Sequence, residues 1–129
     1  MRTPSAPPSS LSLLGLVRHL ADVERGWLRR TIAGEDVGDR FSTEDDEDGD
    51  FNNLDSCTVR EAFDAWREEC EASRQIVDRL QLDAIGTQRT GRQVSLRWVL
   101  LHLIEEYSRH NGHADLLRER LDGATGYDD

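Results

Sequence analysis

The residues best suited to chemistry lie in the segment 95–121, SLRWVLLHLIEEYSRHNGHADLLRERL. At helical spacing this segment carries an apolar stripe formed by Leu96, Val99, Leu103, Leu117 and Leu121. The middle of the stripe is occupied by Glu106 and His110, four residues apart and therefore on one face of the helix. A carboxylate that faces a core is costly unless a charge pairs with it. The pattern therefore predicts a divalent metal ion at this face.

A third candidate ligand, His19, lies in a second amphipathic segment. The expected apolar face of that segment is formed by Leu13, Leu16, Val17, Leu20, Val23 and Trp27. His19 borders this face, where a single histidine is more typical of a packed boundary residue than of a ligand. With Glu106 and His110 it forms a set of two histidines and one carboxylate. Three protein ligands leave coordination positions free for water or substrate, as in catalytic sites; zinc is the expected metal, and nickel, iron and cobalt are alternatives.

Three long helices are expected to position these residues, so we predict an all-α bundle of three helices and loops. The first helix is expected over residues 12–33, with Gly34 as its stop. The second begins after Thr58, where Thr58-Val59-Arg60-Glu61 is typical of a capping box. Its predicted seam contains no ligand and is interpreted as scaffold: Val59, Phe63, Trp66, Cys70, Ser73, Val77 and Leu80. The third helix is the segment 95–121.

The connections are expected to differ in character. Residues 81–94 favour a loop with a short hairpin near Thr90-Gly91. Residues 34–57 carry ten acidic residues against Arg40 alone, a charge of −9 out of a total of −10. We interpret this segment as a solvated acidic loop. Its Glu44-x-Asp46-x-Asp48-Gly49 run is similar to part of a calcium loop, but it lacks the first Asp and the closing Glu, which disfavours calcium.

Composition excludes several classes of protein. The chain has no basic face for nucleic acid and no apolar run of about 18 residues for a membrane, and it begins without a signal-peptide core. We therefore expect a soluble cytoplasmic protein. Cys57 and Cys70 do not form a disulfide framework. The expected organisation is an extended Pro/Ser-rich arm over residues 1–10, one helical domain over 11–125 and a tail over 126–129.

Two motifs resemble the DinB-like metalloprotein superfamily. LGLVRHLADVERGW, residues 14–27, looks like its histidine-bearing helix, and the segments 95–98 and 109–115 look like its last bundle helix. The closest branch is the actinobacterial one related to mycothiol-dependent maleylpyruvate isomerase and the mycothiol S-transferases, which has Glu where many members have a third histidine. The resemblance implies a metal at His19, Glu106 and His110. It also implies mycothiol as a cosubstrate, activated on the metal to attack a small electrophile.

Further roles follow from the same comparison. His113 and Arg109 are the candidate catalytic residues, His113 for proton transfer and Arg109, with Arg118, for an acidic substrate or the carboxylate of the thiol. His102 lies one turn before Glu106 and could also support the site, but an ordinary boundary role is favoured for it. No residues are assigned to cofactor binding.

One departure from the family affects assembly. Its members usually have a further helix before the one that carries the histidine, whereas here a ten-residue arm precedes it. We therefore expect an open face near the first and third helices, covered by a second subunit in a homodimer. Two alternatives to a mycothiol transferase or isomerase remain. One is a metal-binding bundle enzyme of specialised metabolism without thiol chemistry, and the other is a non-catalytic binding or assembly protein.

Overall fold

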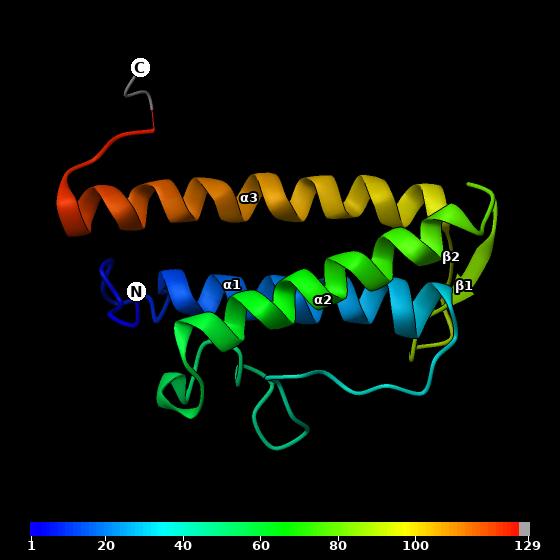
Figure 1. The fold of residues 1–129 in the computed structure, drawn as a ribbon, viewed down its shortest axis with the longest axis horizontal. Helices are drawn as coiled ribbons and strands as arrows, with labels where there is room; N and C mark the ends of the chain where they lie inside the picture. The colour runs from blue at the N-terminus through cyan, green and yellow to red at the C-terminus, as the bar shows by residue number, and fades with distance from the viewer. Residues whose placement is uncertain (127–129) are drawn as a thin grey trace.

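Three helical segments dominate the computed structural model, which describes residues 1–126 (Figure 1). They are α1 (Leu13–Glu24) with its continuation η1 (Arg25–Ile32), α2 (Val59–Asp78) and α3 (Leu96–Asp122). A short 3₁₀ turn, η2 (Leu54–Ser56), precedes α2, and the strands β1 (Ile85–Thr87) and β2 (Gln93–Ser95) precede α3. The predicted mainly α-helical class is confirmed. None of the helices within these residues is long and apolar enough to cross a membrane.

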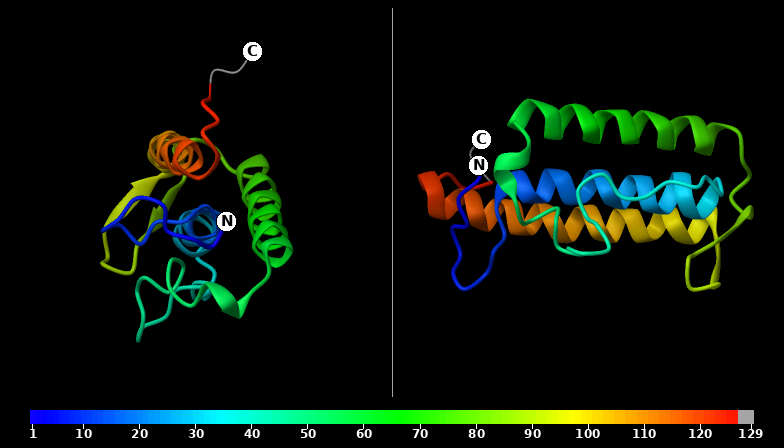
Figure 2. Two further views of the ribbon diagram at one scale, coloured as in Figure 1. Left: turned by 90° about the vertical axis from the view of Figure 1, so that its left-hand side faces the viewer. Right: turned by 90° about the horizontal axis from the view of Figure 1, so that it is seen from below.

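The first helix is the centre of the fold. Seen end-on in Figure 2, α1 lies between α2 and α3, and it packs against both of them. The main core lies where η1 meets the hairpin and the first half of α3. Its buried members are Leu28, Ile32, Ile76, Val94, Leu96, Val99 and Leu103.

The first helix differs from its prediction in two ways. It changes from α- to π-helical geometry at Arg25, whereas a single α-helix was expected over residues 12–33. The predicted apolar stripe is confirmed only in part: Leu16 is buried and Val23 and Trp27 pack against the core, whereas the fully buried Leu14, Ala21 and Leu28 lie outside it. A helix enclosed by two helices and by the acidic segment buries several faces, so one stripe does not describe it.

The second helix begins as expected but is rotated about its axis. The capping box is present: Glu61 N donates to Thr58 Oγ1 over 3.1 Å, and Thr58 N donates to Glu61 Oε2 over 2.6 Å. The predicted seam is confirmed only at Ser73, which is buried, and Val77, which packs against the core; the other buried residues lie beside it and are Ala62, Ala65, Glu69 and Ile76. Glu69 can face inward because Arg25, Arg29 and Arg40 pair with its carboxylate. A polarity pattern assigns such a glutamate to solvent.

The predicted hairpin is confirmed. β1 and β2 pair antiparallel, with Gly86 opposite Val94, and Gly91 in the connecting turn has a φ of +84°. Gly86 packs against the end of η1 so closely that a side chain there would clash with the backbone of Thr31. The hairpin is thereby fixed beside the first helix.

Two segments expected to be exposed are instead attached to the bundle. The arm folds back on its own chain: Ser5 Oγ donates to the Leu117 carbonyl over 3.1 Å, and Arg2 donates to the carbonyls of Leu54 and Cys57. The arm is therefore not extended. The acidic segment crosses α1, and Asp22 receives the backbone N–H groups of residues 40–42. Gly49 and Asp50 are buried, so the interpretation of this segment as a solvated loop is wrong at these two residues.

Two smaller predictions concern the cysteines and the tail. Cys57 and Cys70 are free, as expected. Residues 127–129 of the predicted tail lie outside the described residues.

Candidate metal centre and its cavity

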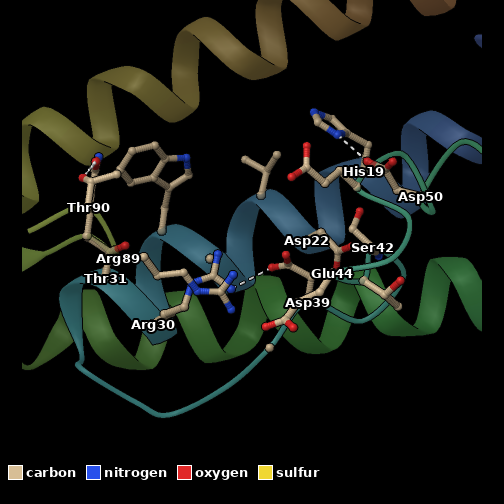
Figure 3. A pocket seen from close by; sticks show the side chains of 17 residues that line it. His19, Asp22, Arg30, Thr31, Asp39, Ser42, Glu44, Asp50, Arg89 and Thr90 are labelled. Carbon is tan, nitrogen blue, oxygen red and sulfur yellow. Dashed lines mark hydrogen bonds and ion pairs between the residues drawn. The ribbon is translucent and has the colours of Figure 1, made fainter.

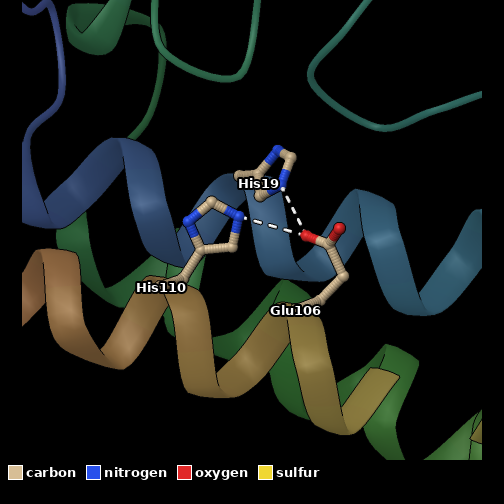
Figure 4. Close-up of side chains that lie close together, drawn as sticks. All are labelled: His19, Glu106 and His110. Atoms are coloured by element: carbon tan, nitrogen blue, oxygen red, sulfur yellow. Dashed lines mark hydrogen bonds and ion pairs between the residues drawn. The ribbon is translucent and has the colours of Figure 1, made fainter. Parts of the chain in front are cut away.

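The structure brings His19, Glu106 and His110 together (Figure 4). One ligand atom from each lies within 4.8 Å of the others, and within residues 1–126 this is the one such group of three. Glu106 Oε2 lies 3.1 Å from His110 Nε2 and 3.7 Å from His19 Nε2. His19 comes from the middle of α1, and the other two come from successive turns of α3. The site thus depends on the packing of α1 against α3.

The donor set suits a divalent cation. Two imidazole nitrogens lie within 3.7 Å of one carboxylate oxygen, and each of the three atoms can supply a lone pair when the histidines are neutral. The side chain of His110 is 9 % exposed, whereas those of His19 and Glu106 are 26 % and 20 % exposed. The site is therefore open on the side of His19 and Glu106. This geometry leaves coordination positions for a small ligand.

Each of the three side chains has a further neighbour on its other polar atom. Asp50 Oδ2 lies 2.7 Å from His19 Nδ1. His102 Nε2 lies 3.6 Å from Glu106 Oε1, and His113 Nδ1 lies 3.2 Å from His110 Nδ1. Such outer contacts orient the side chains that hold a metal.

Asp50 is the residue of this site that sequence reasoning missed, because it belongs to the acidic segment interpreted as solvated. The signal that could have found it is Phe51, one of two aromatic residues in that segment and the one that directly follows Asp50. Phe51 stacks on the His19 ring, with centroids 5.3 Å apart. A large apolar residue in an otherwise charged loop indicates where the loop docks.

The two histidines respond to this environment in opposite directions. Burial lowers the pKa of His19, but the hydrogen bond and charge of Asp50, together with Glu106, outweigh it and raise this pKa above its ordinary value of 6.5. Burial and the neighbouring charge of His19 lower the pKa of His110. A proton therefore competes for His19 at a higher pH than for His110.

A cavity of about 700 Å³ begins at His19 and Asp50 and runs beside α1 to the hairpin loop (Figure 3). Figure 3 shows His19 and Asp50 at one end and Arg89 and Thr90 at the other. Its lining includes five carboxylates, from Asp22, Asp39, Glu44, Glu47 and Asp50, and two arginines, Arg30 and Arg89. The excess of carboxylates disfavours an anionic ligand.

An aromatic cluster lies between the triad and the hairpin. Trp98 stacks on His102 with an interplanar angle of 8°, and Trp27, which lines the cavity, contacts both rings at centroid distances of 5.3 and 4.9 Å. His102 is thus held beside Glu106 by two tryptophans. His102 is half-buried, so the boundary role favoured for it from sequence stays a prediction beside these contacts.

The remaining candidates lie outside this constellation. Arg109 is exposed and does not line the cavity, and Arg118 is exposed with its guanidinium 3.6 Å from Asp122. His113 is half-buried and reaches the triad through His110. In the run that is similar to a calcium loop, Asp46 accepts a hydrogen bond from Asn52. Within residues 1–126 these acids form no further group suited to a metal.

Fold and site together define a helical-bundle protein with a candidate metal centre between two helices. The family model of the mycothiol S-transferases matches residues 1–123, and the chain belongs to this family. This match confirms the resemblance to the mycothiol-related branch inferred from the two motifs. No curated protein and no solved structure matches the chain.

Proposed function

We propose that this chain is a metal-dependent thiol S-transferase that binds one divalent ion, zinc first among the candidates, through His19, Glu106 and His110. The observation that carries the proposal is the convergence of these three ligand atoms within 4.8 Å, beside a cavity, in a member of the mycothiol S-transferase family. A divalent ion at this place supplies positive charge that lowers the pKa of a thiol and favours the nucleophilic thiolate.

The residues of the chain would divide the remaining work. His19, Glu106 and His110 hold the ion, and Asp50 and His102 orient two of these ligands. The cavity beside His19 receives the rest of the thiol and brings the electrophile to it, with Trp27 as an apolar wall. His113, in contact with His110, is proposed to move the proton released by the thiol.

The charge of the cavity selects among thiols. Its carboxylate excess favours a neutral thiol such as mycothiol over anionic thiols such as glutathione. The expected role of Arg109 and Arg118 in holding an acidic group stays a prediction and has no support from the cavity lining. A cytoplasmic location, where low-molecular-weight thiols are kept reduced, also stays a prediction.

The test measures conjugation of monochlorobimane by the zinc-loaded protein with purified mycothiol, glutathione and cysteine. Metal-dependent conjugation is expected with mycothiol and at least about tenfold slower with glutathione, the equivalent of about 1.4 kcal/mol. His110→Ala is the matched variant and should abolish the metal dependence. No conjugation with any of the three thiols in a fully metallated sample would contradict the proposal and favour a metal-binding enzyme without thiol chemistry.

The homodimer predicted from sequence is kept as a proposal for an apolar groove between α2 and α3. The groove has a volume of about 330 Å³ and includes Leu28, Val77, Leu100 and Leu103 in its lining. Ile104, which lies on α3 next to Leu103, is 63 % exposed. Leu28, which also lines the groove, belongs to η1. The open face therefore includes α2 in addition to the first and third helices expected from sequence.

Sedimentation at micromolar concentration tests the homodimer. A dimer is expected for the unchanged chain and a monomer for Ile104→Glu, because a charge in the contact would remain desolvated. Leu116→Glu, a change at a position 62 % exposed elsewhere on α3, is the control and should leave the dimer intact. A stable monomer of the unchanged chain would contradict the proposal.

A further inference from the structure

The His19 ring is held through both of its nitrogens. Nδ1 lies 2.7 Å from Asp50 Oδ2, and Nε2 faces Glu106 Oε2 at 3.7 Å. An ionised carboxylate only accepts hydrogen bonds, so the short contact with Asp50 places a proton on Nδ1. The neutral ring then has its lone pair on Nε2, directed at Glu106 and His110.

Asp50 is itself fixed in place. It is 4 % exposed, and Phe51 N donates to its Oδ1 over 3.0 Å. The Phe51 ring lies on His19 in a space that Gly15 leaves free, since a side chain on Gly15 would lie 2.7 Å from Phe51 Cδ1. Asp50 and Phe51 therefore contact His19 from two directions.

The loop that carries Asp50 is anchored by the residue next to His19. Arg18 is 2 % exposed, and its guanidinium donates to the carbonyls of Gly49, Asn52 and Asn53 over 2.7, 3.2 and 3.3 Å. One turn of α1 thus supplies both the candidate ligand and the anchor of the loop that orients it.

The three candidate ligands are not supported equally. His110 has another histidine on its second nitrogen, and Glu106 has His102 at 3.6 Å. Neither contact fixes which nitrogen carries a proton, because imidazole can donate or accept. Asp50, in contrast, fixes the proton of His19 on Nδ1.

We propose that Asp50 is a positioning residue that holds the Nδ1–H tautomer of His19 and so presents Nε2 to the divalent ion. The proposal rests on the metal site of the proposed function. Carboxylate–histidine pairs of this kind strengthen a ligand by fixing its tautomer and orientation and by raising its basicity.

The first test measures zinc affinity by competition with a chromophoric chelator. Asp50→Ala should weaken zinc binding about 10–100-fold, the usual effect of losing an outer partner of a metal ligand. Asp50→Asn should lose less than about tenfold, because the amide oxygen still accepts the hydrogen bond from Nδ1. Asp48→Asn removes an exposed carboxylate of the same loop and is the matched control, with no expected change.

The second test reads the tautomer of His19 directly in the zinc-loaded protein by long-range ¹H–¹⁵N correlation. The expected pattern is a protonated Nδ1 and a metal-bound Nε2, with a slowly exchanging Nδ1 proton that Asp50→Ala loses. This spectrum of the unchanged chain decides the matter even if Asp50→Ala does not fold, because zinc on Nδ1 of His19 would overturn the proposal.

The outcomes separate the two levels of inference. Equal zinc affinities of Asp50→Ala and Asp48→Asn would overturn the role of Asp50 and leave the metal site intact. A lack of zinc binding by the unchanged chain would overturn both the role of Asp50 and the proposed function.

Discussion

Two carboxylates lie between α1 and its neighbouring helices, and they are satisfied in different ways. Glu106 faces imidazole nitrogens, His110 Nε2 at 3.1 Å and His19 Nε2 at 3.7 Å. Glu24, near the end of α1, accepts hydrogen bonds from hydroxyl groups of both other helices. Tyr107 of α3 donates to its Oε1 over 2.8 Å, and Ser73 of α2 donates to its Oε2 over 2.6 Å. Glu106 and Tyr107 are adjacent in sequence, yet they belong to the two different groups.

The difference teaches how to tell a structural carboxylate from a candidate metal ligand. Hydroxyl groups bring their own protons, so Glu24 is fully satisfied within the protein and is only 7 % exposed. Tyr107 in turn accepts from Trp66 Nε1 over 2.8 Å, which closes the network. Glu106 instead has imidazole nitrogens as its neighbours, and an imidazole nitrogen can either donate a proton or direct a lone pair inward. Such a group can bind a cation when its histidines direct lone pairs at the carboxylate.

The largest expected effect is on zinc affinity, and it concerns the three candidate ligands. His19→Ala, Glu106→Gln and His110→Ala should each lower zinc affinity by more than about 100-fold, beyond the loss expected for an outer partner. Metal analysis after gel filtration should show a stoichiometry that falls from near one to near zero. Glu24→Gln is the control, and unchanged stoichiometry in all three ligand variants would remove the site.

The next largest effect is expected on the stability of the fold, through the hydroxyl groups that donate to Glu24. Tyr107→Phe removes a donor to a buried carboxylate and an acceptor for Trp66, so the free energy of unfolding should fall by about 1–3 kcal/mol. Denaturant titration measures it, and zinc stoichiometry should not change. A loss of zinc binding in this variant would show that the two groups are not independent.

The third prediction uses the opposite pKa shifts of the two histidines. Zinc binding requires neutral histidines, so affinity should fall as the pH falls through the raised pKa of His19, by about tenfold per pH unit for one displaced proton. The slope should steepen at lower pH, where His110, whose pKa is lowered, also takes a proton. Competition titrations between about pH 5 and 8 measure this profile. A zinc affinity independent of pH over that range would contradict histidine ligation.

The smallest effects are expected from the outlying candidates. Arg109→Ala should change zinc affinity and thiol transfer by less than about twofold, since exposed charges far from a cavity contribute little. His113→Ala, which loses a contact with His110, should lower the rate of transfer more than the zinc affinity. Comparing rate and affinity for both variants separates a role in proton transfer from one in support. An effect of Arg109→Ala larger than that of His113→Ala would reverse their proposed roles.

Much of the site could be predicted because its spacing is local. Glu106 and His110 share a face because four residues make about one turn of a helix, whatever the rest of the chain does. The capping box at Thr58 and the turn at Gly91 were also recognised, since each depends on residues within a few positions of one another. His19 was placed with them because it borders the apolar face of the first helix, and the family motifs implied the same set.

The tertiary structure alone decided which polar residues are buried. Glu69 is buried on α2, where three arginines pair with its carboxylate, and no local pattern predicts that arrangement. Asp50 and His19 are 31 residues apart, and Glu24 and Tyr107 are 83 apart. Helical periodicity is set by neighbours along the chain, whereas the burial of a charge depends on partners that meet only when the helices pack.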